Sequence, residues 1–286
     1  MRLSRPDVTV RGIKLELSRR TYIMGILNVT PDSFSDGGRF LDKEKAVRHA
    51  LDMISDGADI VDIGGESTRP GAEEVSVDEE CSRVIPIIRE LSKKTDAVLS
   101  VDTRKPVVAE EALKAGARIV NDVSGLRYDE RMASVAKRYG AALILMHMKG
   151  TPKNMQTDPQ YGDVVKEVAR DLSMSVKIAI QAGVSEDSII VDPGIGFGKS
   201  LEHNLEILNR LEELAILGRP ICVGTSRKSF IGKVLNVPEP ANRLIGTVAT
   251  CVIAVLKGAS ILRVHDVKEI RQASLMADAV IKIKAN

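Results

Sequence analysis

Short apolar segments recur along the chain about every 30 residues. Each is followed by a loop that contains glycine or proline, and then by a stretch whose apolar residues recur at helical spacing. This alternation predicts strands at residues 22–27, 60–63, 98–101, 119–121, 142–146, 189–191, 221–223 and 261–264. Most of these segments are continuous aliphatic runs, as expected of parallel strands that helices cover on both faces.

The intervening segments predict helices at residues 43–55, 77–92, 105–115, 161–182, 201–211, 241–256 and 267–284. Strands and helices that alternate in this way over 286 residues suit a (β/α)₈ TIM barrel, an α/β fold, although an open doubly wound sheet has the same local pattern. Residues 8–17 alternate in polarity around Gly12, which predicts a short N-terminal β-hairpin at the bottom of the barrel. No linker interrupts the pattern, so we expect residues 1–286 to form a single barrel domain.

The charge balance excludes a protein held on nucleic acid or an anionic membrane by a global field. There are 41 basic and 39 acidic residues, which gives a formal net charge of +2. Any anion must therefore be bound by a local cluster of cations. With 44% hydrophobic residues, the chain can bury a core of ordinary size.

Three cysteines, Cys81, Cys222 and Cys251, lie far apart and show no CxxC spacing of a zinc or redox site. We expect them to be reduced and mostly buried thiols. Residues 1–20 lack the apolar run of a signal peptide, and the longest apolar stretch is about half a membrane span. These features favour a cytoplasmic protein.

A polar residue follows nearly every predicted strand. Active sites of barrels lie at the carboxyl ends of the strands, so we expect these side chains to meet at one mouth. In chain order they are Asn28, Asp62 with the 66–69 loop, Asp102, Asn121, His147, Asp192, the 226–228 loop, Arg263 and His265. One such residue alone is often a helix cap or turn former, whereas ends that converge favour a functional site.

In the last predicted strand, alternation places Arg263 and His265 on the same face. An inward arginine is costly to leave unpaired, so it should meet either a bound phosphate or a carboxylate, with Asp62 or Asp102 as the candidates. His49 and His203 lie within helical stretches, where we expect solvated or packed side chains.

The segment 28–38 is long and rich in turn formers for a strand–helix connection, which is typical of a lid, although it could be a solvated loop without function. The 64–71 loop places a hydroxyl and an arginine between stiff turn residues and suits an anion contact. The segment 192–200 looks like a P-loop, but Gly194 lies one residue too late for the GxxxxGK[ST] spacing, so we do not expect ATP binding. Residues 226–229 combine two cations and two hydroxyls where a short helix begins, which favours a carboxylate or phosphate over an exposed basic turn.

Together, segments 24–38, 64–71, 100–104, 121–125, 192–198, 226–230 and 263–266 resemble dihydropteroate synthases, which are pterin-binding barrels. The resemblance spans nearly the whole chain. The first loop and the Ser-Arg-Lys-Ser segment are its specific motifs, whereas the Asp-Pro-Gly and Asp-Thr-Arg pieces also fit related pterin-binding methyltransferases.

The resemblance implies a transferase that condenses 6-hydroxymethyl-7,8-dihydropterin pyrophosphate with p-aminobenzoate in folate biosynthesis. It implies that the pterin contacts Asp102, Asn121, Met146, Asp192, Phe197 and Lys228. The implied pyrophosphate contacts are Asn28, Thr68, Arg69, Arg263 and His265, and the implied aminobenzoate contacts are Phe34, Thr68, Pro70, Phe197, Lys228 and Ser229. Catalytic roles would fall to Asp36, Asp102, Lys228, Arg263 and His265.

The resemblance further implies Mg²⁺ with Asn28 as a ligand, a homodimer, and competition by sulfonamides for the aminobenzoate site. The late helices at 241–256 and 267–284, rich in Ala, Val and Ile, are candidate contact faces for the dimer.

No strong general base lies near Ser229, and the aryl amine is already neutral at pH 7. We therefore expect a dissociative displacement in which stabilising the departing pyrophosphate matters most. Two alternatives stay open. A methyltransferase that passes a methyl group from a folate to a corrinoid protein would leave Arg263, His265 and the 226–229 segment unexplained. A catalytically idle pterin-binding barrel would bind pterin without turnover.

Overall fold

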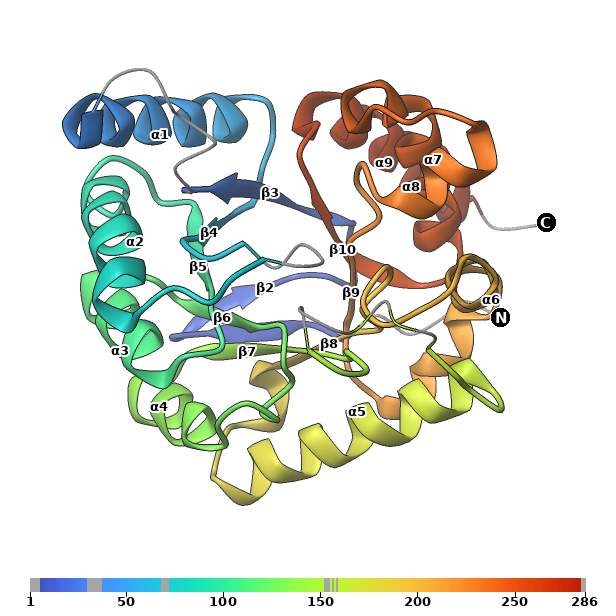
Figure 1. The fold of residues 1–286 in the computed structure, drawn as a ribbon, viewed down its shortest axis with the longest axis horizontal. Coiled ribbons are helices and arrows are strands. Elements are labelled where there is room, and N and C mark those ends of the chain that lie inside the picture. The colour runs from blue at the N-terminus through green and yellow to red at the C-terminus, as the bar shows by residue number, and fades with distance from the viewer. Residues whose placement is uncertain are drawn as a thin grey trace.

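A computed structural model describes residues 6–29, 38–67, 72–151, 155, 157 and 159–283 of the protein. Eight parallel strands close into a barrel in the order β10, β3, β4, β5, β6, β7, β8 and β9 (Figure 1). Their bounds are β3 Tyr22–Asn28, β4 Ile60–Gly64, β5 Val98–Asp102, β6 Ile119–Asp122, β7 Ala142–Met146, β8 Ile189–Asp192, β9 Ile221–Val223 and β10 Ala259–Val264. The barrel that the sequence pattern predicts is therefore confirmed, and the open sheet is excluded.

Helices follow the strands and form the outer ring of the barrel (Figure 1). They are α1 Gly38–Ser55, α2 Val77–Leu91, α3 Pro106–Ala115, α4 Arg131–Tyr139, α5 Val164–Gln181, α6 Leu201–Asn209, α7 Ser229–Leu235, α8 Leu244–Leu256 and α9 Val267–Lys282. Short 3₁₀ turns at Glu186–Ser188, Leu211–Leu217 and Pro240–Arg243 complete the connections.

Alternation along each strand separates two layers of core. In β4, Val61 and Ile63 belong to the large cluster between the strands and the helices, whereas Ile60 belongs to the cluster inside the barrel. Asp62 is fully buried and makes its contacts across the barrel interior. The barrel interior is therefore apolar near the amino ends of the strands and polar near their carboxyl ends.

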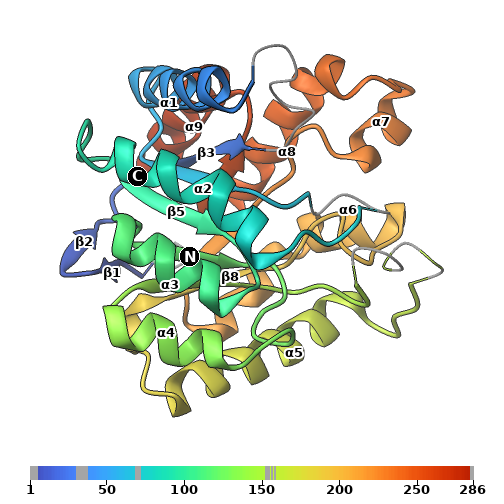
Figure 2. The same ribbon diagram turned by 60° about the vertical axis from the view of Figure 1, so that its left-hand side comes forward.

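A hairpin of β1 Val8–Val10 and β2 Ile13–Leu15 lies where the barrel strands begin, at the end opposite the long βα loops (Figure 2). Val8, Val10, Leu15 and Leu17 belong to the same buried cluster as the apolar residues inside the barrel. This packing confirms the predicted hairpin and its place at the bottom of the barrel.

One helix escapes prediction from the sequence. Helix α4 has only nine residues, with Met132, Ala133, Val135 and Ala136 on its buried face, so its periodic pattern is too short to stand out in the sequence. Its end is marked by Gly140, which has a φ of +60° and lies in the left-handed region that suits glycine. Other differences concern element ends: for example, α5 begins three residues later than expected because the Asp163 side chain caps it at Lys166 N, 3.1 Å away.

All three cysteines are free, and Cys222 and Cys251 are buried, as expected. Within the described residues no single helix has the length and apolarity to cross a membrane. The bent pair of segments Ser229–Leu235 and Pro240–Leu256 meets the length and composition criteria together, with an angle of 78° between them.

The hairpin's contribution to stability can be tested at Leu17, which is fully buried. Leu17→Ala should lower the free energy of unfolding by about 2–5 kcal/mol, because it removes buried methyl groups and leaves a cavity. Ile13→Ala on the same hairpin is a matched control, since Ile13 is 39% exposed and its replacement should cost less than about 1 kcal/mol. Urea unfolding of both variants measures the difference, and equal losses would contradict a hairpin that seals the barrel.

Candidate active site

Charged and polar side chains meet inside the carboxyl end of the barrel. The guanidinium of Arg263, on β10, donates from Nε to Asp62 Oδ2 and from Nη2 to Asp102 Oδ2, both at 2.7 Å. Asn121 Nδ2 donates to the same Asp62 oxygen at 2.9 Å. The sequence left either a bound phosphate or a carboxylate as the partner of Arg263, and in the described chain the partners are two carboxylates.

Burial shifts the pKa values of the charged residues in this group. It raises the pKa of Asp102, an effect that the nearby Arg263 only partly offsets. For Arg263 burial acts against the charge, but Asp62 and Asp102 outweigh it and raise the pKa of the guanidinium. The buried oxygens Asp62 Oδ1, Asp102 Oδ1 and Ser100 Oγ accept no hydrogen bond from the described residues. A buried acceptor of this kind calls for a donor, which a ligand can supply to the Asp102 oxygen at the carboxyl end of β5.

Asp192 ends β8 beside an apolar wall. Its Oδ1 accepts the backbone N–H of Gly194 at 2.6 Å, and burial raises the pKa of the carboxyl. Met146 pairs with Asp192 across the β7–β8 ladder. The wall consists of Val123, Met146, Met148 and Met155, with Phe197 packed against them. A flat, partly polar ring would find apolar contact and a carboxylate side by side here.

Hydrogen bonds to three successive residues, 196–198, hold the loop after Asp192. Gly196 N donates to Asn204 Oδ1 at 2.6 Å, Lys199 Nζ donates to Phe197 O at 3.0 Å, and Tyr161 Oη donates to Gly198 O at 2.8 Å. Glycine is required at position 198, where φ is +61° and an added Cβ would lie 2.3 Å from Lys149 O. The loop is therefore a fixed support that presents the Phe197 ring.

Lys228 reaches this loop from the other side. Its Nζ donates to Ile195 O and lies 4.3 Å from the centroid of the Phe197 ring. Burial lowers the pKa of Lys228 to about 8, against the opposing attraction of Asp192. Lys228 is also the N-cap residue of α7, and Ser229 is the exposed first residue of that helix. The helix start predicted after residue 226 is thus confirmed.

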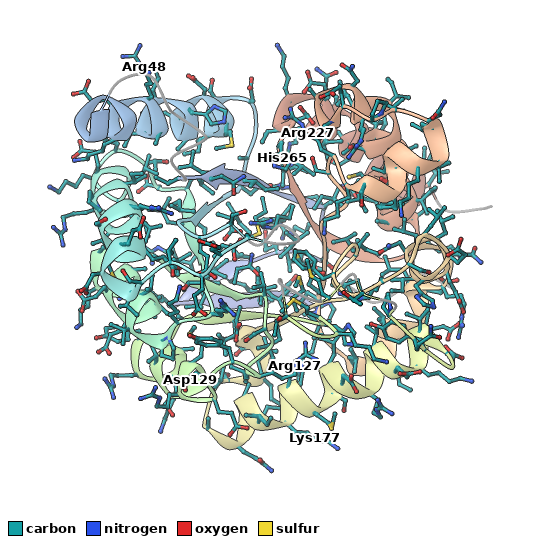
Figure 3. The ribbon with its side chains drawn as sticks, viewed as in Figure 1. Arg48, Arg127, Asp129, Lys177, Arg227 and His265 are labelled. Atoms are coloured by element: carbon teal, nitrogen blue, oxygen red, sulfur yellow. The ribbon has the colours of Figure 1, made fainter. Side chains whose placement is uncertain are left out.

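His265 and Arg227 lie beside one another near the end of β10, whereas Arg127 lies on the opposite side, near α5 (Figure 3). Ser226 Oγ accepts the backbone N–H of His265 at 3.2 Å and lies 3.0 Å from His265 Nδ1. Arg227 forms an ion pair with Asp266. Because the Ser226 hydroxyl already accepts one hydrogen bond, it can donate its own proton to Nδ1, which orients the His265 ring.

Sequence reasoning missed the buried pair of His147 and Lys199. Lys199 Nζ lies 3.0 Å from His147 Nδ1, and His147 Nε2 lies 3.4 Å from Asp171 Oδ2. Burial lowers the pKa of His147 to about 2 and lowers that of Lys199 well below its ordinary value. Lys199, the lysine of the P-loop-like segment, thus contacts other residues of the protein. The one signal in the sequence is that Lys199 directly precedes Ser200, which caps α6.

The base of the second loop is fixed by Glu66. This side chain accepts from Arg104 Nη2 at 3.0 Å, from Lys105 Nζ, and from the backbone N–H of Val75 at 3.3 Å. It therefore joins the two ends of the loop to the segment after Asp102. Five expected site residues lie outside the described residues: Phe34, Asp36, Thr68, Arg69 and Pro70.

No group of three His, Cys, Asp or Glu side chains that could hold a metal ion occurs in the described part of the chain. Asn28 ends β3 and is half-buried. One amide oxygen alone does not make a resident metal site.

Known proteins that are similar to this chain define its class. Residues 24–265 match the family described as "Pterin binding enzyme". A dihydropteroate synthase of Bacillus subtilis is 51% identical over 267 residues, which cover 93% of this chain and 91% of the relative. The chain therefore belongs to the pterin-binding enzymes that fold as closed (β/α)₈ barrels.

Solved structures narrow the class further. A Yersinia pestis dihydropteroate synthase in a sulfonamide drug complex has a TM-score of 0.91 and 46% identity, covering 97% of this chain and all of that one. A Xanthomonas albilineans dihydropteroate synthase in complex with 7,8-dihydropteroate has a TM-score of 0.86 and 38% identity, covering 98% of this chain and all of that one. Within the pterin-binding enzymes, the chain is a member of the dihydropteroate synthase family.

The fixed loop yields a test at Gly198. Gly198→Ala combines a left-handed backbone with a clash against Lys149 O, whereas Gly140, with a φ of +60°, has nothing within 4 Å of an added Cβ. Gly140→Ala should cost about 1–2 kcal/mol from backbone conformation alone. Gly198→Ala should cost a further 1–3 kcal/mol or so from overpacking and should lower turnover by moving Phe197. Unfolding and activity assays compare the two, and equal behaviour would contradict a fixed loop.

Proposed function

We propose that the protein condenses 6-hydroxymethyl-7,8-dihydropterin pyrophosphate with p-aminobenzoate, giving 7,8-dihydropteroate and pyrophosphate. Family membership supports this reaction, as does the relative whose structure contains 7,8-dihydropteroate. The observation in this chain that carries the proposal is the convergence of two buried carboxylates, an amide and the Arg263 guanidinium at the barrel mouth. The 1–286 chain would act as one pterin-binding barrel domain.

The pterin would bind between the polar group and the apolar wall. An aminopyrimidinone edge offers two parallel N–H donors, which suit the Asp192 carboxylate. Asn121 directs its Nδ2 toward Asp62, so its amide oxygen is turned toward other donors. Asp102 Oδ1 is a further buried acceptor that a pterin N–H would satisfy. Met146, Phe197 and Lys228 would contact the ring.

Departure of pyrophosphate would be the difficult step. The bond between the pterin methylene carbon and the pyrophosphate oxygen breaks, and its electron pair leaves with the pyrophosphate. Arg263, His265 and Asn28 would hold this anion, with Arg69 and Thr68 beyond the described residues. The carboxylates of Asp102 and Asp192 would stabilise the cationic pterin. The aryl amine then attacks the methylene carbon and releases a proton to solvent.

The aminobenzoate would lie where Lys228, Phe197 and the start of α7 meet. A helix start with an exposed Ser229 suits a carboxylate, although α7 is short, so the ammonium of Lys228 would supply the charge. Phe34, Asp36 and Pro70, all outside the described residues, would complete the site. Sulfonamides should compete here, in keeping with the Yersinia pestis complex.

Mg²⁺ would act as a substrate-borne ion. Asn28 can offer one oxygen, and pyrophosphate oxygens would supply most of the other ligands. Bound in this way, the ion would neutralise charge on the leaving group. No protein carboxylate would be needed to hold it.

We also propose a cytoplasmic homodimer. Helices α8 and α9 expose large apolar side chains, namely Ile245, Ile253, Leu256, Leu275, Met276 and Val280. Exposed apolar surface on neighbouring helices is typical of a protein–protein contact, and a second copy would cover it. Three free thiols suit a reducing compartment.

The function can be tested with purified protein, pterin pyrophosphate, Mg²⁺ and p-aminobenzoate, by following pyrophosphate release and the product. Release that depends on the amine and yields dihydropteroate is the expected result. A folded protein that binds pterin but releases no pyrophosphate would contradict the proposal and favour the methyltransferase or the idle barrel.

Two variants should separate binding from chemistry. Asp192→Ala removes the acceptor for two pterin N–H groups and should abolish measurable pterin binding. Arg263→Ala should spare much of the pterin affinity but slow turnover by about 10²-fold or more, the scale of one lost electrostatic stabiliser. Calorimetry and steady-state kinetics measure the two effects. Normal pterin binding by the first variant, or normal turnover by the second, would contradict these roles.

The Lys228 ammonium should set an alkaline limit on enzyme activity. Its pKa of about 8 means that the charged form becomes the minor one as pH rises above that value. If the charge is needed, kcat/KM should fall about tenfold per pH unit above 8, because this ratio reports the free enzyme. Lys228→Arg should abolish the fall at any remaining level of activity, since arginine keeps its charge. Lys233→Met on the same helix is the control, and an unchanged fall in the arginine variant would contradict the assignment.

A further inference from the structure

No substrate contact is proposed for Asp62, although it lies beneath residues that would contact the substrate. It sits in the middle of β4, pairs in register with Ser100 on β5, and is fully buried. The chain therefore keeps an ionisable group in the barrel interior, where burial without partners is costly. The residues that Asp62 binds explain why a carboxylate is buried there.

One oxygen of Asp62 holds two different residues. Oδ2 accepts Asn121 Nδ2 at 2.9 Å and Arg263 Nε at 2.7 Å. These partners come from β6 and β10, on either side of β4, so the carboxylate joins two strands that are not neighbours in the barrel. Charge-assisted hydrogen bonds of this length are among the stronger ones in proteins.

The contact to Asn121 decides which way the amide faces. A carboxylate can only accept, so the NH₂ group must turn toward Asp62 and the amide oxygen must turn away from it. Without Asp62 the amide could rotate by 180° at little cost and present its NH₂ group to a ligand instead. A ligand that donates an N–H to Asn121 would then meet a donor.

The contact to Arg263 decides which part of the guanidinium is used. Asp62 and Asp102 occupy the Nε and Nη2 donors, two of the five N–H groups that an arginine carries. The side chain is thereby fixed as a planar fork, and its remaining N–H groups point away from the two carboxylates. An anion bound by those groups would find them already oriented.

We propose that Asp62 is a positioning residue that orients Asn121 toward the pterin and Arg263 toward the pyrophosphate through a single carboxylate oxygen. The proposal rests on the proposed function for the identity of the two ligand groups. It predicts that replacing Asp62 weakens ligand binding only through these two partners.

The test is a double-mutant cycle on pterin affinity, with 6-hydroxymethyl-7,8-dihydropterin as the probe and calorimetry as the readout. Asp62→Ala should weaken binding about tenfold, a loss of about 1.4 kcal/mol. In the Asn121→Ala background the same change should have little effect, because the residue that it orients is gone. Asp62→Asn should restore most of the affinity, since its amide oxygen can accept the hydrogen bond from Asn121.

Ser100→Ala is the matched control, because Ser100 is equally buried, pairs with Asp62 in register, and has an Oγ without a hydrogen-bond partner in the described chain. It should leave pterin affinity unchanged. Equal losses from Asp62→Ala in both backgrounds would overturn the proposal. Should the alanine variant not fold, an Asp62→Asn variant that binds as weakly as Asn121→Ala would overturn it too.

This cycle stands apart from the test of the reaction. Wild-type protein that binds pterin but releases no pyrophosphate contradicts the proposed function, while the cycle still reads the Asp62–Asn121 coupling. Additive losses in a fully active enzyme contradict only the role of Asp62.

Discussion

The guanidinium of Arg263 lies between two carboxylates in the interior of a closed barrel, and the chemistry proposed for this protein depends on that contact. Asp62 and Asp102 keep a cation where burial alone would disfavour it. The cation in turn allows two carboxylates to lie in one barrel interior. Each charge lowers the free-energy cost of burying the other.

Closure of the barrel makes this contact possible. Residues 62 and 263 are 201 positions apart, and they meet because β10 pairs with β3 and β3 with β4. Below them the interior is filled by aliphatic side chains and sealed by the hairpin. The polar layer therefore rests on a packed apolar one, and its side chains have little freedom to rearrange. Fixed dipoles and charges of this kind stabilise developing charge without having to reorganise during the reaction.

The loop from Asp192 to Lys199 extends the same rigidity to the apolar wall. Its polar backbone groups are bound by Asn204, Lys199 and Tyr161. Lys228 closes it from α7 and contacts Phe197. A ring seated there would meet a surface already in place, so that little binding energy would be lost in ordering the site.

Much of this arrangement can be predicted from the sequence, because local patterns carry it. Continuous aliphatic runs mark the strands, and polar residues at their ends mark the mouth. Alternation places Arg263 inside, but its choice of carboxylate over a bound anion depends on which strands close the barrel. The pairing of Lys199 with His147 is equally non-local, because the two residues are 52 positions apart, and no periodicity of the sequence predicts it. Helix α4 is missed for a different reason, since it has only nine residues and its helical periodicity extends over little more than two turns.

The central claim is that these fixed charges drive departure of pyrophosphate before the amine attacks. The most direct test is the secondary deuterium isotope effect on turnover, measured with pterin pyrophosphate deuterated at the reacting methylene carbon. If the methylene becomes cationic before the new bond forms, the deuterated substrate should react measurably more slowly when chemistry limits the rate. An effect of unity, measured while chemistry limits the rate, would contradict the dissociative account.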